Sequence, residues 1–229
     1  MENASNATAT WARVVAAVVI ALIPIVLVLT SVRLLLTQIF VRVDYAVPGF
    51  PADTFGFSLQ DRLHWAPIAL DYLLNDAGID YLGNLRFDSG RPVYNERELR
   101  HMVDVKKLVQ VALRVWAVGL VAVAISLIAL WRGRQSRQGW RSIRAGALGT
   151  VALMLLLGVG LAAAFSFVFV GFHRLFFSGD SWLFFYSDTL IRLFPEQFWQ
   201  FAFAMIALGA LVQAGILYLL ARWRLRSTA

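Results

Sequence analysis

Long uninterrupted apolar runs dominate the chain. Four of them cover about residues 14–36, 108–131, 145–172 and 198–221. Each reaches the roughly 20 residues that a helix needs to cross the hydrocarbon core of a bilayer. The pattern therefore predicts an all-α integral membrane protein that forms a single domain over residues 1–229 and has four transmembrane helices. The first run is long and lacks a small-x-small cleavage site, so we interpret it as a retained anchor rather than a signal peptide.

The basic residues predict the orientation of these helices. Residues 131–144 carry five arginines and no acid, and Arg222, Arg224 and Arg226 repeat the pattern near the C-terminus. By the positive-inside rule both segments are cytoplasmic, so an even number of spans places both termini there. Two extracytoplasmic loops remain, at about residues 37–107 and 171–197, and they contain every histidine and every acid except Glu2.

Composition narrows the possible chemistry. Hydrophobic residues make up 59% of the chain, the formal net charge is +7 and there is no cysteine. The absence of cysteine excludes thiol nucleophiles, disulfides and thiolate metal sites. We attribute the positive charge to membrane orientation and predict no nucleic-acid partner.

The large outer loop is predicted to be partly helical. Ser58 and Asp61 form a helix-capping pattern ahead of apolar residues at helical spacing, which predicts a short interfacial helix up to about Leu74. A second capping pattern at Asn95 and Glu98 runs without a breaker into the second span, so one long helix is expected there.

This long helix carries the first group of candidate residues. Glu98, His101 and Asp104 recur at a spacing of three and share one face. Each also has a simpler interpretation: Glu98 as a cap for the Asn95 amide, Asp104 as a surface partner of Arg100, and His101 as a surface histidine.

Helix rise brings His173 to a similar depth. His101 lies about 16 Å beyond the hydrocarbon edge of the second span, and His173 lies about 13 Å beyond that of the third. The two imidazoles are therefore candidates for one pocket at headgroup level. The loop after His173 is rich in aromatic residues, which are often found in the belt that a membrane protein forms at the interface.

Three motifs resemble the lipoprotein intramolecular transacylases, Lit, of bacterial cytoplasmic membranes. They read Glu98-x-x-His101-Met-x-Asp104-Val, Phe172-His173-x-Leu-Phe-Phe-x-Gly-Asp180-Ser-Trp182-Leu-Phe and Asp188-x-Leu-Ile-x-Leu-x-Pro195-Glu196-x-Phe198. The four-span layout is similar to that family across nearly the whole chain.

The resemblance implies a reaction and a place for it. The sn-2 acyl chain of an S-diacylglyceryl-cysteine lipoprotein would move to the α-amino group of the same cysteine and leave a lyso-form lipoprotein. It also implies a multi-pass protein of the bacterial cytoplasmic membrane, with its active site on the extracytoplasmic face. The implied partners are diacylglyceryl-modified lipoproteins and membrane lipids, and no cofactor is needed because donor and acceptor are already tethered.

A free α-amine has a pKa of about 7.7 to 8.0, so it needs a base at neutral pH. Our hypothesis is that His101 is that base, held by Asp104 or Glu98, while His173 acts on the ester side; the reverse assignment stays open. His64, beside Trp65, matches none of the three motifs and is set aside. The weaker candidates for supporting or orienting roles are Arg100, Arg174 and Asp180. The candidates for contact with substrate or lipid are Met102, Phe172, Phe176, Phe177 and Trp182.

Three other functions compete with this interpretation. A zinc or copper site is disfavoured because no His-x-x-x-His pair occurs, so no metal is predicted. A glutamate-type intramembrane protease lacks its paired-glutamate motif. A non-enzymatic transport or assembly subunit is the strongest alternative. The spans contain almost no charged residues that could form a transport pathway, and Arg114 is the main exception.

Overall fold

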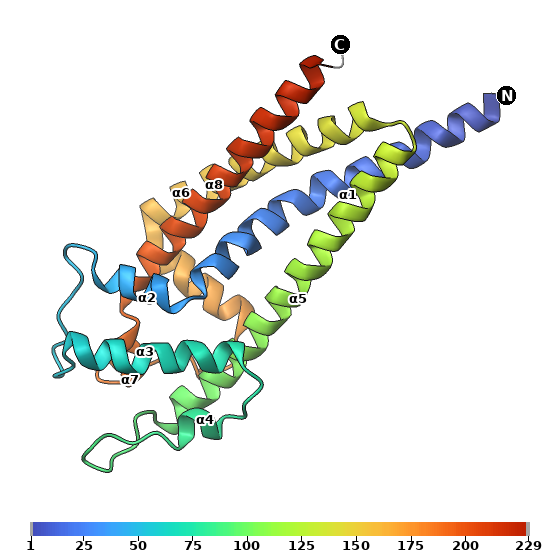
Figure 1. Ribbon diagram of the computed structural model, residues 1–229. Coiled ribbons are helices and arrows are strands. Elements are labelled where there is room, and N and C mark those ends of the chain that lie inside the picture. The colour runs from blue at the N-terminus through green and yellow to red at the C-terminus, as the bar shows by residue number, and fades with distance from the viewer. Residues whose placement is uncertain (1, 228–229) are drawn as a thin grey trace. The chain divides into compact units, whose positions relative to one another are not determined.

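The computed structural model describes residues 2–227, with side chains from Thr10 onward, and the secondary-structure elements of this part of the chain are helices joined by loops. Its only β-pairing is an isolated bridge between Arg86 and Pro92. The helices are α1 (Glu2–Leu35), α2 (Gln38–Tyr45), α3 (Leu59–Leu74), α4 (Asp80–Gly83), α5 (Glu96–Arg132), α6 (Ser136–Phe176), α7 (Thr189–Leu193) and α8 (Glu196–Ser227) (Figure 1).

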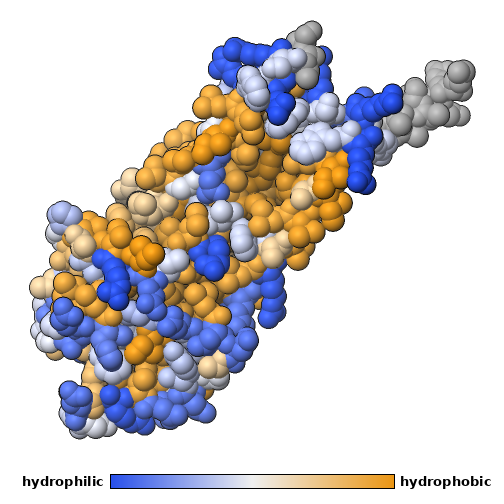
Figure 2. All heavy atoms as spheres, in the orientation of Figure 1, coloured by the Kyte–Doolittle hydropathy of each residue, from blue (hydrophilic) through white to orange (hydrophobic). Residues whose placement is uncertain are grey.

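Four of these helices are long and apolar enough to cross a membrane, which confirms the predicted number of spans among the described residues. They are Thr10–Leu35 of α1 and the whole of α5, α6 and α8. Hydrophobic residues make up most of the surface that Figure 2 shows between the hydrophilic ends. The last three extend well beyond the predicted apolar runs because polar first turns and basic last turns continue the same helices.

The chain folds into two compact units. The bundle unit comprises the residues up to Val32, Leu113–Val159 and the residues from Met205 onward. The site unit comprises Arg33–Ala112 and Gly160–Ala204.

Small residues bring the helices of the bundle unit together. A Cβ added at Gly146 would lie 2.7 Å from the Cβ of Ile23, so α6 and α1 touch where glycine leaves room. Polar side chains add hydrogen bonds between helices: the Trp116 indole donates to the Thr30 hydroxyl at 3.0 Å, and the Gln213 amide donates to the Ser31 hydroxyl at 2.9 Å. Helix α1 therefore packs against α5, α6 and α8 within this unit.

The site unit has its own apolar core. Helix α3 contacts α2, α4 and α7 (Figure 1), and the core contains buried residues such as Tyr72, Leu82 and Leu193. A helix forms at the predicted place as α3, and Ser58 and Asp61 form the predicted capping box at its start, while its location at the membrane interface stays a prediction. Lys106 of α5 ties the end of α3 into this core, because its ammonium donates to the Ala77 carbonyl at 2.6 Å and lies over the Tyr72 ring.

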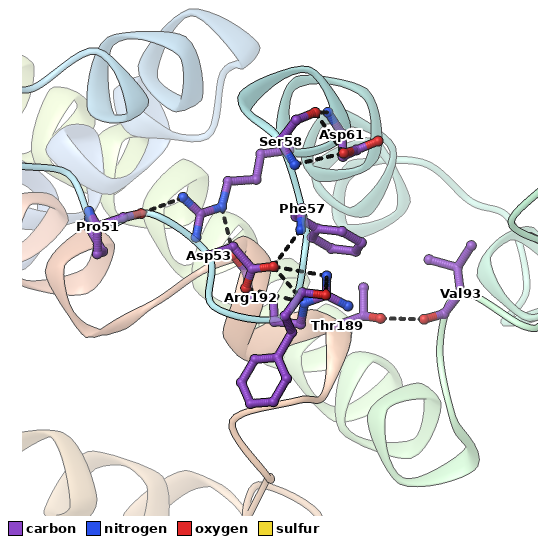
Figure 3. Close-up of polar contacts among 10 residues, drawn as sticks. Pro51, Asp53, Phe57, Ser58, Asp61, Val93, Thr189 and Arg192 are labelled. Carbon is purple, nitrogen blue, oxygen red and sulfur yellow. Dashed lines mark hydrogen bonds and ion pairs between the residues drawn. The ribbon is translucent and has the colours of Figure 1, made fainter.

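A buried ion pair anchors the loop before α3 to α7 (Figure 3). The Arg192 guanidinium donates to Asp53 at 2.9 Å and lies 3.5 Å from the centre of the Phe57 ring. Burial disfavours ionised Asp53, but the hydrogen bonds from Arg192 and from the Phe57 amide outweigh it and lower the pKa of this carboxyl. Arg62 of α3 completes the anchor by donating to the Arg192 carbonyl at 2.9 Å and the Pro51 carbonyl at 2.7 Å.

The close contact of α6 with α1 predicts that Gly146→Ala destabilises the protein. The added methyl group meets the branched Cβ of Ile23, and such overpacking costs about 1–3 kcal/mol, more than the gain of up to about 1 kcal/mol in helix propensity. Gly215→Ala is the matched control, because a Cβ there meets nothing within 4 Å. Thermal unfolding of the purified protein in detergent is expected to show a lower Tm for Gly146→Ala alone; equal Tm values in the two variants would contradict the close contact.

Candidate active site

Two histidine rings stack in the site unit. The centroids of His101 and His173 lie 6.0 Å apart with an interplanar angle of 20°, and the residues are only 8% and 9% exposed. His101 comes from α5 and His173 from the last turn of α6, which are 72 residues apart in sequence (173 − 101). The two imidazoles thus lie side by side, as helix rise led us to expect.

A capping box fixes the start of the helix that carries His101. The Asn95 amide donates to Glu98 at 2.8 Å, and the Glu98 amide donates to the Asn95 side chain at 3.0 Å. These reciprocal bonds satisfy two backbone N–H groups at the start of α5 and define its first turn. His101 follows Glu98 by three residues, so its height and direction depend on this cap.

The same glutamate also holds the loop that follows α6. Its second carboxylate oxygen accepts a hydrogen bond from the Leu190 amide at 2.7 Å, and Glu98 is only 1% exposed. The neighbouring Asp188 accepts from Asn95 at 3.0 Å and forms an ion pair with Arg97 at 2.9 Å. We call Asn95, Arg97, Glu98, Asp188 and Leu190 the loop clamp. It attaches the segment before α8 to the first turn of α5.

A backbone carbonyl fixes the tautomer of His173. Its Nδ1 lies 2.8 Å from the carbonyl oxygen of Phe169, one turn earlier in α6. A carbonyl only accepts hydrogen bonds, so the hydrogen of this bond belongs to Nδ1, and in the neutral ring the Nε2 lone pair is free. A non-helical residue, Ala164, separates the segment that carries Phe169 and His173 from the rest of α6.

Aromatic side chains enclose the two imidazoles. Phe177 and Phe184 meet the His101 ring edge to face, with centroids 4.9 and 5.2 Å away. Phe169 and Trp182 lie 4.3 and 5.3 Å from the His173 ring. The Nδ1 atom of His101 is buried and has no hydrogen-bond partner. The Nε2 atoms of the two histidines do not belong to this class of buried, unpartnered atoms. The walls of the site are thus apolar, and its polar atoms are ring nitrogens.

The carboxylates predicted to orient His101 are engaged elsewhere, which corrects that part of the hypothesis. Within the described residues no hydrogen bond joins His101 to Glu98 or Asp104. Glu98 serves as the cap and loop anchor, and Asp104 pairs with Lys107 at 3.6 Å. The alternative pairing of Asp104 with Arg100 is also wrong, because Arg100 lies 3.8 Å from Glu96. These residues share a helix face with His101 but point to other partners.

The remaining predicted residues divide into two groups. Phe177 is buried against both histidines, Trp182 contacts His173, and Phe172 lies 5.7 Å from His173 and 4.8 Å from the largely exposed Phe176. Those outside the immediate site are Met102, which is buried in the core, and the exposed Arg174 and Asp180. His64 is also exposed and contacts the Trp65 ring, in keeping with its exclusion.

Sequence reasoning missed three groups that shape the site. Phe184 was not singled out from the other aromatic residues of its loop, although its ring contacts His101. Phe169 precedes His173 by four residues, a spacing that does indicate a contact on one helix face. The Leu190 amide has no sequence signal at all, because any backbone N–H is a possible donor.

The site offers little to a metal ion. In the part of the chain that the structure describes, no group of three or more histidine or acidic side chains is placed to hold one. What the arrangement supports is proton transfer by two imidazoles beside an apolar surface.

The fold and this site define a helical integral membrane protein with a paired-histidine centre. A family model for the lipoprotein intramolecular transacylase Lit matches residues 17–199. The chain therefore belongs to the Lit family and is an acyltransferase, which decides against a transport or assembly subunit.

Individual relatives are similar in sequence or in fold. An uncharacterized protein of Aquifex aeolicus (strain VF5) is 26% identical over 194 residues, covering 82% of this chain and 83% of that one. The solved structure of Bacillus cereus Lit has a TM-score of 0.76 at 21% identity, covering 96% of this chain and 98% of that one. A B. cereus Lit variant in which a histidine is replaced by arginine has a TM-score of 0.77 at 20% identity, covering 99% and 97%.

The loop clamp predicts that Glu98→Gln destabilises the protein. A carboxamide has one oxygen, so it cannot accept from both the Asn95 and Leu190 amides, and its NH₂ group then faces a buried donor. Leaving such a buried group unpaired costs about 1–3 kcal/mol. Thermal unfolding is expected to show this loss, together with lower transacylation because Phe184 and α7 lose their anchor.

Glu96→Gln is the matched control for this substitution. Glu96 lies on the same turn, but its side chain is 94% exposed and its 3.8 Å ion pair with Arg100 lies at the surface. We expect Glu96→Gln to leave Tm and activity nearly unchanged. Two variants with the same Tm would rule out the clamp as a stabilising contact.

Proposed function

We propose that the stacked pair of His101 and His173 catalyses the transfer of the sn-2 acyl chain of a diacylglyceryl lipoprotein to the α-amine of its own N-terminal cysteine. One observation carries the proposal: two buried imidazoles face each other, and the Nδ1 of His173 is held by the Phe169 carbonyl. Family membership supplies the reaction class, and the geometry supplies the groups for it.

His173 is the base in this mechanism. With hydrogen fixed on Nδ1, its Nε2 lone pair accepts the proton that the α-amine loses as nitrogen attacks the ester carbonyl. This is the reverse of the assignment that we first favoured from the sequence. A backbone carbonyl thus performs for His173 the orienting role that we had given to a carboxylate.

His101 acts on the ester oxygens. The tautomer with hydrogen on Nε2 makes it a hydrogen-bond donor, first to the developing oxyanion and then to the glyceryl oxygen that leaves. The step is balanced, because the C–N bond forms as the C–O bond breaks and the proton that His173 takes from the amine is delivered to the departing glyceryl oxygen, which returns both imidazoles to their neutral forms. An ester becomes an amide, and no second substrate is needed.

The aromatic walls suit an acyl chain. Phe172, Phe177 and Trp182 border the histidines, and Phe176 continues the apolar surface outward. These rings bury hydrocarbon well and keep water from the reacting ester. Membrane lipids would contact the same exposed rings at the edge of the site.

The histidine assignment predicts that His101→Ala and His173→Ala each lower the rate of transacylation by about 10² to 10⁴-fold. His64→Ala is the control and is expected to retain activity, because His64 is exposed and lies outside the pair. The measurement is mass spectrometry of the N-terminal lipopeptide after incubation of a synthetic diacylglyceryl substrate with purified enzyme. Full lyso-form production by either pair variant would refute the proposal.

The two roles are separable by pH. The substrate amine loses its own proton above a pKa of about 8, so the need for a base falls as pH rises. The defect of His173→Ala should therefore shrink between pH 7 and pH 9, whereas the defect of His101→Ala should persist. The opposite result would return the base role to His101.

We further propose that the histidine site is extracytoplasmic, that both termini are cytoplasmic and that the chain works as one integral membrane domain of the bacterial cytoplasmic membrane. The arginines of residues 131–144 and of the C-terminal end of α8 support this orientation by the positive-inside rule.

This orientation predicts the accessibility of single cysteines. The chain has no cysteine of its own, and Ser89 and Ser136 are both exposed. In intact spheroplasts, a membrane-impermeant maleimide should label Ser89→Cys, and it should label Ser136→Cys only after permeabilisation. Labelling of Ser136→Cys in sealed cells would overturn the proposed orientation.

A further inference from the structure

A basic cavity lies at one end of the bundle unit, far along the sequence from the histidines. Its volume is about 390 Å³, and its lining is mostly arginine. The lining residues are Arg137, Arg141, Arg144, Tyr218, Arg222, Leu225 and Arg226. Figure 2 shows hydrophilic residues gathered near the C-terminal end of α8.

Two helices direct these charges into one space. Arg137, Arg141 and Arg144 recur at i, i+4 and i+7 and so share one face of α6. Arg222 and Arg226, four residues apart, share one face of α8. Like charges on facing helices repel one another, and an anion between them would remove this repulsion.

No acid of the described residues neutralises this group. The basic residues that form ion pairs in the described part of the chain are Arg97, Arg100, Lys107 and Arg192, and none of them lines the cavity. The first turn of α6 adds to the imbalance, because it contains Arg137 and no acid at the positive end of the helix dipole. An anion at this position would satisfy both the guanidinium groups and the helix end.

Neighbouring aromatic residues place the cavity at a membrane interface. Trp131 of α5 and Trp140 of α6 lie 5.8 Å apart, and Trp223 is exposed next to Arg222 on α8. Tryptophan gathers at the headgroup level of membranes. The exposed apolar side chains of Leu148 and Leu219 continue along the same helices and provide a surface for lipid tails.

We propose that this cavity binds the phosphodiester headgroup of an anionic membrane phospholipid. The guanidinium groups of α6 and α8 grip the phosphate oxygens, and the acyl chains lie along the apolar faces of the two helices. The proposal is independent of the transacylation chemistry, because all of its residues belong to the bundle unit and both histidines belong to the site unit.

Lipid titration of the purified protein followed by native mass spectrometry tests the site. Phosphatidylglycerol and cardiolipin are the anionic probes, phosphatidylcholine is the zwitterionic one, and inorganic phosphate is the soluble one. We expect one tightly retained anionic lipid per protein and a loss of about tenfold or more in affinity for Arg141→Gln/Arg222→Gln. The single variant Arg222→Gln is measured in the same way and is expected to show a smaller loss of affinity for anionic lipid. This variant tests the site if the double variant does not fold.

Arg13→Gln/Arg132→Gln is the matched control. Both arginines are exposed residues of the bundle unit outside the cavity lining, and the change in net charge is the same. We expect this pair to bind anionic lipid within about twofold of wild type, since neither arginine lines the cavity in which the other guanidinium groups converge. Equal losses in the two pairs, equal retention of phosphatidylcholine, or binding of inorganic phosphate alone would each overturn the proposed lipid site.

Discussion

The geometry of the active site depends on the two oxygens of the Glu98 carboxylate. One oxygen accepts from the Asn95 amide and starts α5, and the other accepts from the Leu190 amide and attaches the loop before α8. Because His101 lies one turn from the first bond and Phe184 lies in the loop held by the second, a single buried side chain aligns the imidazole with its aromatic wall. Loss of either bond would leave a buried amide without a partner.

Local features of the fold were predictable from the sequence because they depend on neighbours in the chain. The four spans follow from apolar runs, and the starts of α3 and α5 follow from capping pairs three residues apart. The meeting of His101 and His173 followed from helix rise, which fixes depth. Helix rotation is not fixed by rise, so the direction in which Asp104 points could not be obtained in this way.

Contacts between distant segments explain the errors. Asp104 and Glu98 are suitable partners for His101 by spacing, yet Lys107 and the Leu190 amide engage them instead. The choice among such partners depends on how α5 packs against α7 and the loop between α6 and α7. Patterns of neighbouring residues in the sequence do not predict this packing. The tautomer of His173 is a different case, because its partner is a carbonyl four residues earlier in the same helix. Helical spacing shows that this contact is possible, but it does not show that the side-chain rotamer makes it.

Burial favours the neutral form of both imidazoles, because it disfavours a charged ring, and the pairing of nearby acids is consistent with this. Asp188 is neutralised by Arg97 and Asp53 by Arg192, so two ion pairs of the site unit serve to hold loops. An ionised carboxylate bonded to His101 would favour its imidazolium, and a positive charge there would hinder the proposed transfer of a proton to the neighbouring His173. Aromatic rings and a backbone carbonyl orient the two histidines without adding a charge, and they leave an apolar surface for the acyl chain. The arrangement thus separates the groups that bind charge from the groups that move protons, and a reaction between a tethered amine and an ester requires only the latter to be free.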